Sequence, residues 1–509
     1  MSNFKYALTF VVAINWDGLP AQPGTLDSTF GTNGVVLTSI GGLTSDDAYS
    51  MAIQQDGKIT VAGSSYSGFS VTQWALVRYS AGGGLDNTFG GSGIVTTFFD
   101  STYSAARSVV IQTDGKIIAA GVSNPDSLCS AGTIARYNPN GSLDLNFGTN
   151  GKVIMDCLDM LDIASIALQA DGRMVLVGTS TGVLGVVRLN QDGTPDNTFG
   201  TNGLVVQFSA GYGNACVIQP DGKIIAAGMG PNGFTITRLN TDGSIDNSFG
   251  TNGIASTTFG SVNAAYAVAL QPDGKIVVAG SSGPASQHDF AVARFDSDGS
   301  LDNSFGTGGK VLTTIGGADD RARSAAVQPD GKILLAGWTH VSGLDYDFAV
   351  VRYNSDGTLD ASFGMGGKTI TSITNNIDRA YSVGLQPDGK VIAAGSAVTT
   401  GKPFALVRYI SGLNLGVLNF SPATASMLVY PNPIPGKTTL EFTLLMEERI
   451  TIDLADAPGR TLSTFMDSEH LPAGEHQLDI TLPATLPSGP YLIVISSPSG
   501  RMSVQVFKK

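Results

Sequence analysis

Short apolar runs separated by polar, glycine-rich loops make up most of this chain. In one representative stretch the runs cover residues 264–271, 275–280, 290–295 and 310–314, and Pro-Asp-Gly joins the first two. They are rich in Val, Ile and Ala and show no convincing 3.6-residue apolar period, so they predict strands. An Asp-Gly pair between two apolar runs is typical of a hairpin, because Gly tolerates the positive φ of the turn. The stretch therefore predicts a unit of four strands.

This unit recurs along the chain, and three sequence markers count its copies. The pair Phe-Gly, usually within Leu-Asp-x-x-Phe-Gly, begins at Phe30, Phe89, Phe147, Phe199, Phe249, Phe305 and Phe363. The triplet Asp-Gly-Lys/Arg begins at Asp56, Asp114, Asp171, Asp221, Asp273, Asp330 and Asp388. An Arg at the end of an apolar run stands at Arg78, Arg136, Arg188, Arg238, Arg294, Arg352 and Arg408. The three markers agree on seven copies.

The two ends of the repeat predict a closed ring. The first copy is preceded by an isolated strand at residues 35–39, and the last copy, residues 380–409, stops after its third strand. We expect strand 35–39 to complete that last unit, which would remove an open sheet edge. Four-stranded units repeated around an axis form a β-propeller. The predicted fold is therefore all-β, with a seven-bladed β-propeller over residues 26–410.

The repeat resembles the delta-60 family of bacterial propeller repeats. The residues that carry the resemblance are the hexapeptide Leu-Asp-Asn-Ser-Phe-Gly at 301–306 and Gln-Pro-Asp-Gly-Lys at 271–275, with their counterparts in the other copies. The resemblance covers about three quarters of the chain and implies a propeller. It implies no activity, because the family is largely uncharacterised.

The markers stop after Tyr409, and the chain continues through a linker, residues 411–426, rich in Gly, Ser and Asn. Residues 427–509 then alternate short apolar segments with turn signals, which predicts a small Ig-like β-sandwich. Their order, with Tyr-Pro-Asn-Pro at 430–433, Gly-Arg at 459–460, Leu-x-x-Gly-x-His at 471–476, Ser-Gly-x-Tyr at 488–491 and a basic end, resembles the C-terminal sorting domain of the type IX secretion system. The resemblance implies the type IX secretion machinery as a partner, and either release or attachment at the cell surface.

Composition and the N-terminus fit an exported protein. The chain has 509 residues and a formal charge of −13, so it has no electrostatic reason to bind nucleic acid. No run approaches 18 apolar residues, which excludes a transmembrane helix. Residues 1–21 combine Lys5, a short apolar stretch at 6–14 and Ala21, and they predict a signal peptide cleaved before Gln22. The alternative is a loose terminal strand.

Candidate binding residues gather in loops of the fifth and sixth copies. The loops after the second and the fourth strands share one face of a propeller, and here they vary in length and content. The candidates are His288, Asp289, Asp319, Asp320, Trp338, His340, Asp345, Tyr346 and Asp347. Trp338 and Tyr346 favour sugar or protein binding, while two His with several carboxylates suit a metal ion or glycoside hydrolysis. Asp289 and Asp347 stand at equivalent repeat positions, so turn or rim roles remain an alternative.

These observations favour a secreted or surface-attached binding module for a glycan or a protein. One alternative is a secreted carbohydrate-active enzyme that uses carboxylates such as Asp319 and Asp320, and another is a structural surface protein with no ligand. We assign no catalytic residue, because no nucleophile triad and no phosphate-binding loop is evident. No cofactor is expected, although residues 296–302 resemble part of a calcium loop, with Asx turns as the alternative.

Repeated acids and three cysteines complete the candidates. Asp302 and its counterparts cap turns or pair with the repeated Arg, and such pairs, if exposed, contribute about 0–1 kcal/mol each. A further hypothesis treats Asp47, Asp320 and Asp378 as equivalent and places them with Asp162 in an acidic ring at the channel mouth. Cys129 and Cys157 are candidates for a disulfide. Cys216 is interpreted as a small buried apolar residue.

Overall fold

The computed structural model describes residues 22–41, 45–66, 71–99, 101–126, 129–155, 162–180, 182–207, 211–260, 262–284, 287–413, 424–430, 434, 436–444, 447–455, 461–487, 489–497 and 500–508. Every regular element in these residues is a strand, which confirms the all-β prediction. The predicted signal peptide and most of the predicted linker lie outside the described residues.

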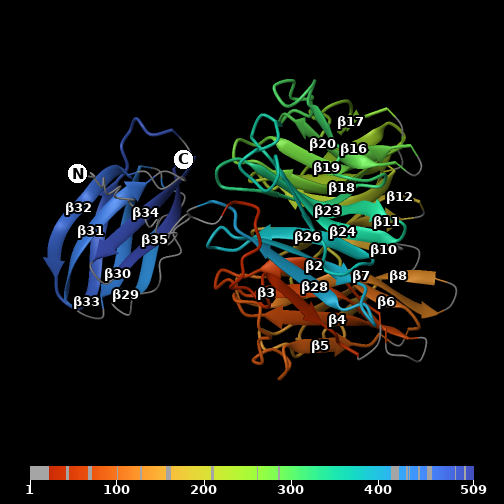
Figure 1. The fold of residues 1–509 in the computed structure, drawn as a ribbon, viewed down its shortest axis with the longest axis horizontal. Helices are drawn as coiled ribbons and strands as arrows, with labels where there is room; N and C mark the ends of the chain where they lie inside the picture. Colours follow the sequence, from red (N-terminus) through yellow and green to blue (C-terminus); the bar gives the residue numbers. More distant parts are fainter. Residues whose placement is uncertain are drawn as a thin grey trace, which may run out of the picture.

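The residues from β1 to β28 form a propeller of four-stranded antiparallel sheets (Figure 1). Six of the sheets are β2–β5 (Asp46–Ile53, Ile59–Tyr66, Thr72–Tyr79, Ile94–Thr97), β6–β9 (Ser104–Ile111, Ile117–Asp126, Cys129–Tyr137, Lys152–Ile154), β10–β13 (Asp162–Leu168, Met174–Ser180, Val183–Leu189, Leu204–Gln207), β14–β17 (Tyr212–Ile218, Ile224–Gly230, Gly233–Leu239, Ile254–Thr257), β18–β21 (Val262–Leu270, Ile276–Gly283, Asp289–Phe295, Lys310–Thr313) and β22–β25 (Arg321–Val327, Ile333–Ser342, Asp345–Tyr353, Lys368–Thr371). The first strand of each sheet is innermost, and these inner strands contact one another around a central channel.

A further sheet joins the two ends of the propeller. It consists of β26 (Asp378–Leu385), β27 (Val391–Ala397), β28 (Phe404–Tyr409) and, as its outer strand, β1 (Val35–Thr38). β1 runs antiparallel to β28, with Val35 opposite Val407. This is the pairing expected from the offset between the first and last copies of the repeat, and it leaves β28 without an open edge.

The repeated sequence markers meet in one buried cluster per sheet. In the β22–β25 sheet, Arg352 Nε donates to Asp360 Oδ2 at 2.7 Å, and Lys332 Nζ donates to the same oxygen at 2.8 Å. The Arg352 guanidinium lies 4.5 Å from the centroid of the Phe363 ring and donates to the backbone carbonyl of Ser411, which follows the next sheet. The Arg, the Asp of Leu-Asp, the Phe of Phe-Gly and the Lys of Asp-Gly-Lys therefore recur because they form one interaction.

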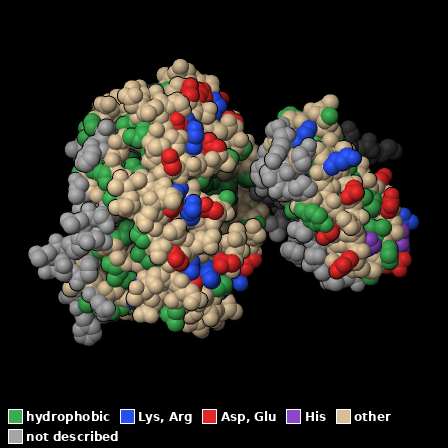
Figure 2. Space-filling model, turned by 180° about the vertical axis from the view of Figure 1, so that it is seen from behind, with side chains coloured by type: hydrophobic (Ala, Val, Ile, Leu, Met, Phe, Trp, Pro, Cys, Tyr) green, Lys and Arg blue, Asp and Glu red, His purple; other side chains and the backbone are tan. Residues whose placement is uncertain are grey.

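The same cluster links each sheet to its neighbour around the ring. Five of the other arginines donate to the Asp of their own sheet and to a carbonyl beside the next sheet: Arg78 (Asp86, Pro139), Arg136 (Asp144, Gln191), Arg188 (Asp196, Thr241), Arg238 (Asp246, Ser297) and Arg294 (Asp302, Ser355). Arg408 forms an ion pair with Asp27 and donates to the carbonyl of Ala81. Figure 2 shows Lys and Arg side chains beside acidic ones, recurring in a row down the propeller.

Burial changes the expected energetics of these pairs. Arg352 is 2% exposed and Asp360 5%, so the low value expected for exposed pairs does not apply. Removing one partner of a buried pair typically costs about 3–5 kcal/mol, because the other charge is left uncompensated. The clusters hold the ring together at the end of the propeller that carries the uniform turns.

These clusters predict acid sensitivity. Burial opposes ionisation of Asp86, but hydrogen bonds from Thr88 and the charges of Arg78 and Lys58 outweigh it and lower the pKa of Asp86 to about 2. A lowered pKa stabilises the fold above the unfolded value near 4, and this contribution, about 2 kcal/mol for one such Asp, is lost as the pH falls toward 2. Urea midpoints should therefore drop between pH 4 and 2.5, with a shallower drop for Asp86→Asn. Equal drops in the two proteins would contradict this role.

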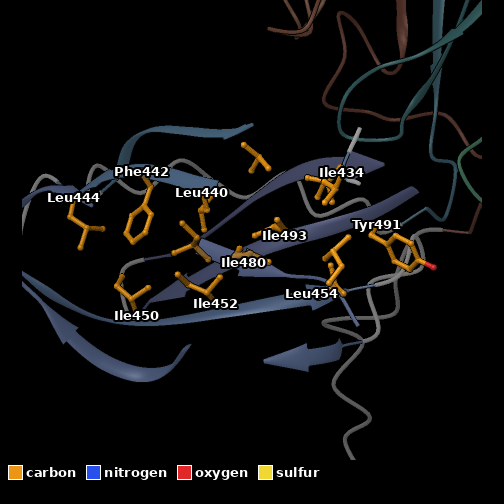
Figure 3. Packing of buried hydrophobic residues seen from close by; sticks show 14 residues of the cluster. Ile434, Leu440, Phe442, Leu444, Ile450, Ile452, Leu454, Ile480, Tyr491 and Ile493 are labelled. Carbon is orange, nitrogen blue, oxygen red and sulfur yellow. The ribbon is translucent and has the colours of Figure 1, made fainter. Parts of the chain in front are cut away.

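The C-terminal residues form a separate sandwich of two sheets. One sheet contains β29 (Thr424–Tyr430), β30 (Lys437–Leu444) and β33 (Gly474–Thr481), and the other contains β32 (Thr461–Leu471), β31 (Glu448–Ala455), β34 (Gly489–Ser497) and β35 (Gly500–Lys508). Their facing side chains, such as Phe442, Ile452 and Ile493, pack into one core (Figure 3). Near the basic end, Lys508 Nζ donates to the backbone carbonyls of Pro483 and Leu486 at 2.8 and 2.6 Å.

Candidate functional site

The loops that vary between copies contact one another at one end of the propeller. These are the loops after the second strand and after the fourth strand of each sheet, and we call this end the variable face. Asp320 N donates to His288 O at 2.7 Å, and Tyr346 N donates to Asn376 O at 3.1 Å, so each contact joins a loop of one sheet to the loop entering the next. The uniform turns and the marker clusters occupy the other end. The two ends of the same strands thus differ in composition.

His288 and Asp319 lie together at the rim of the variable face. His288 is 7% exposed, and its Nδ1 lies 2.9 Å from Asp319 Oδ1. Arg321 Nε donates to the same oxygen at 2.8 Å. Burial opposes the charge of Asp319, but Arg321 and His288 outweigh it and lower the pKa of this carboxyl. Asp319 is therefore an ionised group held in an ion pair.

Asp320 and Asp378 are structural residues and do not form an acidic ring at the channel mouth. Both are 0% exposed. The backbone N–H of Ile315 donates to Asp320 Oδ2 at 2.7 Å, and that of Ile373 donates to Asp378 Oδ2 at 2.9 Å, so each carboxylate holds the loop that precedes it. Burial raises the pKa of Asp320, and a fully buried carboxyl cannot touch a substrate.

The register also corrects the equivalence assumed for Asp47. In β2, β22 and β26 the residue opposite the second-strand Gly is Ala48, Ala322 and Ala380. Asp46 and not Asp47 is therefore the counterpart of Asp320 and Asp378. Asp47 forms an ion pair with Lys402, and Asp162 lies 3.3 Å from Arg107 Nε.

Trp338 is 3% exposed and cannot serve as a surface platform for a sugar. It lies within β23, opposite Phe348, where the sequence suggested a loop position. Its ring meets that of Tyr381 edge-on, with centroids 5.5 Å apart, and the guanidinium of Arg379 lies 5.0 Å from its ring centroid. Trp338 is therefore a buried residue that packs against Tyr381 and Arg379.

The remaining candidates follow the hairpin of β23 and β24. His340 and Tyr346 face each other with ring centroids 5.0 Å apart, and His340 Nε2 lies 3.0 Å from Gly343 O. Asp289 and Asp347 occupy equivalent positions, each preceding the buried Phe of its third strand. Burial raises the pKa of Asp347, and the charge of Asp345 adds to the effect. Among the described residues, no group of three or more His, Cys, Asp or Glu is arranged to hold a metal ion.

A ring of channel residues was missed by the sequence analysis. Each inner strand carries a β-bulge, and the extra residue, which has no partner in the register, lines the channel. The ring is Tyr49, Arg107, Ala164, Asn214, Tyr266, Arg323 and Tyr381. The bulge brings the inner strand so close to the second strand that a Cβ on Gly337 would lie 1.8 Å from Arg321 O. The sequence signal that could have found this ring is a position whose residue differs between copies, although the positions around it are similar in every copy.

These residues surround an open polar pocket of about 310 Å³. Its lining includes Arg107 and Arg323 and no acidic residue, although the whole chain carries 42 acids against 29 basic residues. The Arg323 guanidinium lies 3.9 Å from the Tyr266 ring centroid and 4.7 Å from that of Trp338. Its Nε is buried and has no hydrogen-bond partner within the described residues, and burial lowers the pKa of Arg323.

Serines occupy the next position of five inner strands. Ser50, Ser108, Ser165, Ser324 and Ser382 each accept a backbone N–H from the adjacent inner strand at 3.1–3.3 Å. These bonds tie the inner strands together. They use a lone pair of each hydroxyl, so its hydrogen stays available for donation.

The described residues of the calcium-loop and cysteine candidates have local structural roles. Asp298 Oδ1 accepts hydrogen bonds from the backbone N–H and the hydroxyl of Ser300 at 2.9 and 2.7 Å, which is the Asx-turn alternative. Burial raises the pKa of the Cys216 thiol to about 12. Cys157 and the side chain of Cys129 lie outside the described residues, so their disulfide stays a prediction.

Two protein-family models match the chain. The one described as a domain of unknown function (DUF5122) beta-propeller matches residues 54–89, 112–147, 169–199, 219–249, 271–305 and 328–363, and the one described as a secretion system C-terminal sorting domain matches residues 428–509. The chain is a repeat β-propeller protein with a type IX sorting domain. The sheet that closes the propeller is absent from the matches because its markers are split between the two chain ends. The sorting domain marks this repeat β-propeller protein as secreted through the type IX system to the cell surface or beyond.

Solved structures similar to the repeat β-propeller protein include virginiamycin B lyase from Staphylococcus aureus, at 11% identity and a TM-score of 0.44, covering 73% of this chain and 98% of that one. PorZ, described as a surface component of the type IX secretion system of Porphyromonas gingivalis, matches at 12% identity and a TM-score of 0.32, covering 93% and 75%. No curated protein matches the chain. No helix in the described residues could cross a membrane.

Proposed function

We propose that this secreted protein is a binding module that takes a glycan or protein ligand on its variable face. The division between the two ends of the propeller carries the proposal. At one end the repeated Arg, Asp, Phe and Lys residues are engaged in the same buried cluster in sheet after sheet, as for Arg352 and Asp360. The other end has loops that differ between copies, and the inner strands that these loops enter line the open pocket of the channel.

Apolar side chains are exposed on the variable face, as they also are at the opposite end at Met365. Tyr212 is 47% exposed, Val262 56% and Leu344 73%, and all three lie in or next to loops of the variable face. On a face whose loops differ between copies, exposed apolar side chains provide contact area for a partner. The sorting domain provides export, which places this face outside the cell.

Paired insertions test the proposal. A short epitope inserted between Gly343 and Leu344 lies at the variable face, whereas the same epitope between Met365 and Gly366 lies at the other end of β24 and serves as the control. Both sites are exposed turns, Leu344 at 73% and Met365 at 89%, so both should accept the insertion. A chain of residues 22–509, without the predicted signal peptide, would be screened against neutral glycans, acidic glycans and peptides.

We expect saturable binding to at least one member of the panel, at least tenfold weaker with the first insertion and unchanged with the second. A blank panel, or equal binding by the two insertion variants, would overturn the proposal. Circular dichroism melting curves would establish that both insertion variants are folded.

A further inference from the structure

We propose that the central channel binds an acidic sugar, with Arg323 pairing with the carboxylate. The inference rests on the proposed function and deepens it, because it names a site in the channel that the variable loops lead into, and the class of ligand. It starts from the bulges, which project one side chain per inner strand into the channel at a position whose residue differs between copies.

The charge of the channel favours an anion. Arg323 makes no ion pair within the described residues, and Arg379 beside it adds to the positive potential. The charges of Arg321 and Arg107 are compensated, because these residues pair with Asp319 and Asp162. Burying a guanidinium without a partner is unfavourable unless a ligand supplies the negative charge. Tyr266 and Trp338 hold Arg323 between their rings, so the side chain is already ordered before a ligand arrives.

The rest of the lining favours a sugar over a bare anion. Tyr49, Tyr266 and Tyr381 combine an apolar ring with a hydroxyl, Asn214 carries an amide, and five serines add hydroxyl groups. This set of donors and acceptors matches a ring that carries several hydroxyls and one carboxylate. The volume of about 310 Å³ lies at the small end of ligand pockets, about 300–1,000 Å³, and suits a saccharide unit rather than a folded domain.

Isothermal titration of the chain of residues 22–509 at low salt tests the inference. The probes are D-glucuronate and D-galacturonate, the neutral sugars D-glucose and D-galactose, and sodium sulfate. We expect saturable binding of at least one hexuronate, with the matching neutral sugar and sulfate at least tenfold weaker. Arg323→Ala should weaken hexuronate binding about ten- to hundredfold, the effect of losing one charge-assisted contact. Arg321→Ala is the matched control, since Arg321 pairs with Asp319 and does not line the pocket.

A second variant covers the case in which Arg323→Ala fails to fold. Ala164→Asp places a carboxylate at the same ring position of another strand and should abolish hexuronate binding through repulsion. Binding that survives both substitutions, or sulfate binding as tight as that of the hexuronate, would overturn the inference. If the panel finds a ligand blocked by the Gly343–Leu344 insertion while both hexuronates fail to bind, the inference fails and the proposed function stands.

Discussion

A chain that lacks residues 22–40 should not form a soluble, folded monomer. These residues supply β1, and they supply Asp27 and Phe30 to Arg408, which lies at the opposite end of the propeller sequence. Every side chain of β28 is buried in the intact protein, so the deletion would expose a full apolar edge strand. It would also leave Arg408 and Lys390 without their shared carboxylate. We expect a loss comparable with the entire stability of a domain, about 5–15 kcal/mol.

Size-exclusion chromatography and thermal unfolding measure this effect. Deletion of residues 414–509 is the control, because the sandwich has its own core and its removal should leave the propeller melting temperature within a few degrees. A synthetic peptide of residues 22–40 added in trans should restore part of the folded monomer. A deletion chain that is monomeric and melts like the intact protein would show that β1 does not close the ring.

The second large effect is expected at Arg352. Arg352→Ala would leave the buried Asp360 with the more exposed Lys332 as its one remaining charged partner among the described residues, and it would break the link to Ser411 in the next sheet. The expected loss is about 3–5 kcal/mol. Arg352→Lys should recover part of it, because the charge is kept while the planar contact with Phe363 is lost.

Urea unfolding followed by tryptophan fluorescence reports this loss, since Trp74 and Trp338 are both buried in the propeller. Arg321→Ala, in the same sheet, is the control: its partly exposed pair with Asp319 should contribute less than about 1 kcal/mol. If Arg352→Ala and Arg321→Ala lower the midpoint equally, the buried clusters do not hold the ring.

The scaffold was predictable from sequence because its interactions recur. The Arg, Leu-Asp, Phe-Gly and Asp-Gly-Lys positions repeat together, and the structure shows that they touch, as Arg352, Asp360, Phe363 and Lys332 do. The pairing of β1 with β28 followed from the phase of the same repeat. Periodicity identifies contacts that every copy makes.

The channel residues proposed to bind a ligand were harder to predict because they depend on register. A bulge shifts the alternation of side chains by one residue, so the sequence pattern did not show that Arg323 lines the channel. The same kind of offset made Asp47 look equivalent to Asp320, although Asp46 occupies that place. Trp338 resembled a surface aromatic because β23 extends further than its apolar run, and Tyr381 from the next sheet covers it.

The most direct test of the division between scaffold and binding residues compares two arginines of the same sheet in two assays. Arg323 lines the channel and Arg352 belongs to a buried cluster. We predict that Arg323→Ala loses hexuronate binding while its urea midpoint stays close to that of the unaltered protein. Arg352→Lys should lower the midpoint while the folded protein binds as before. Arg323→Ala that lowers the midpoint as much as Arg352→Lys and still binds the hexuronate would contradict this division.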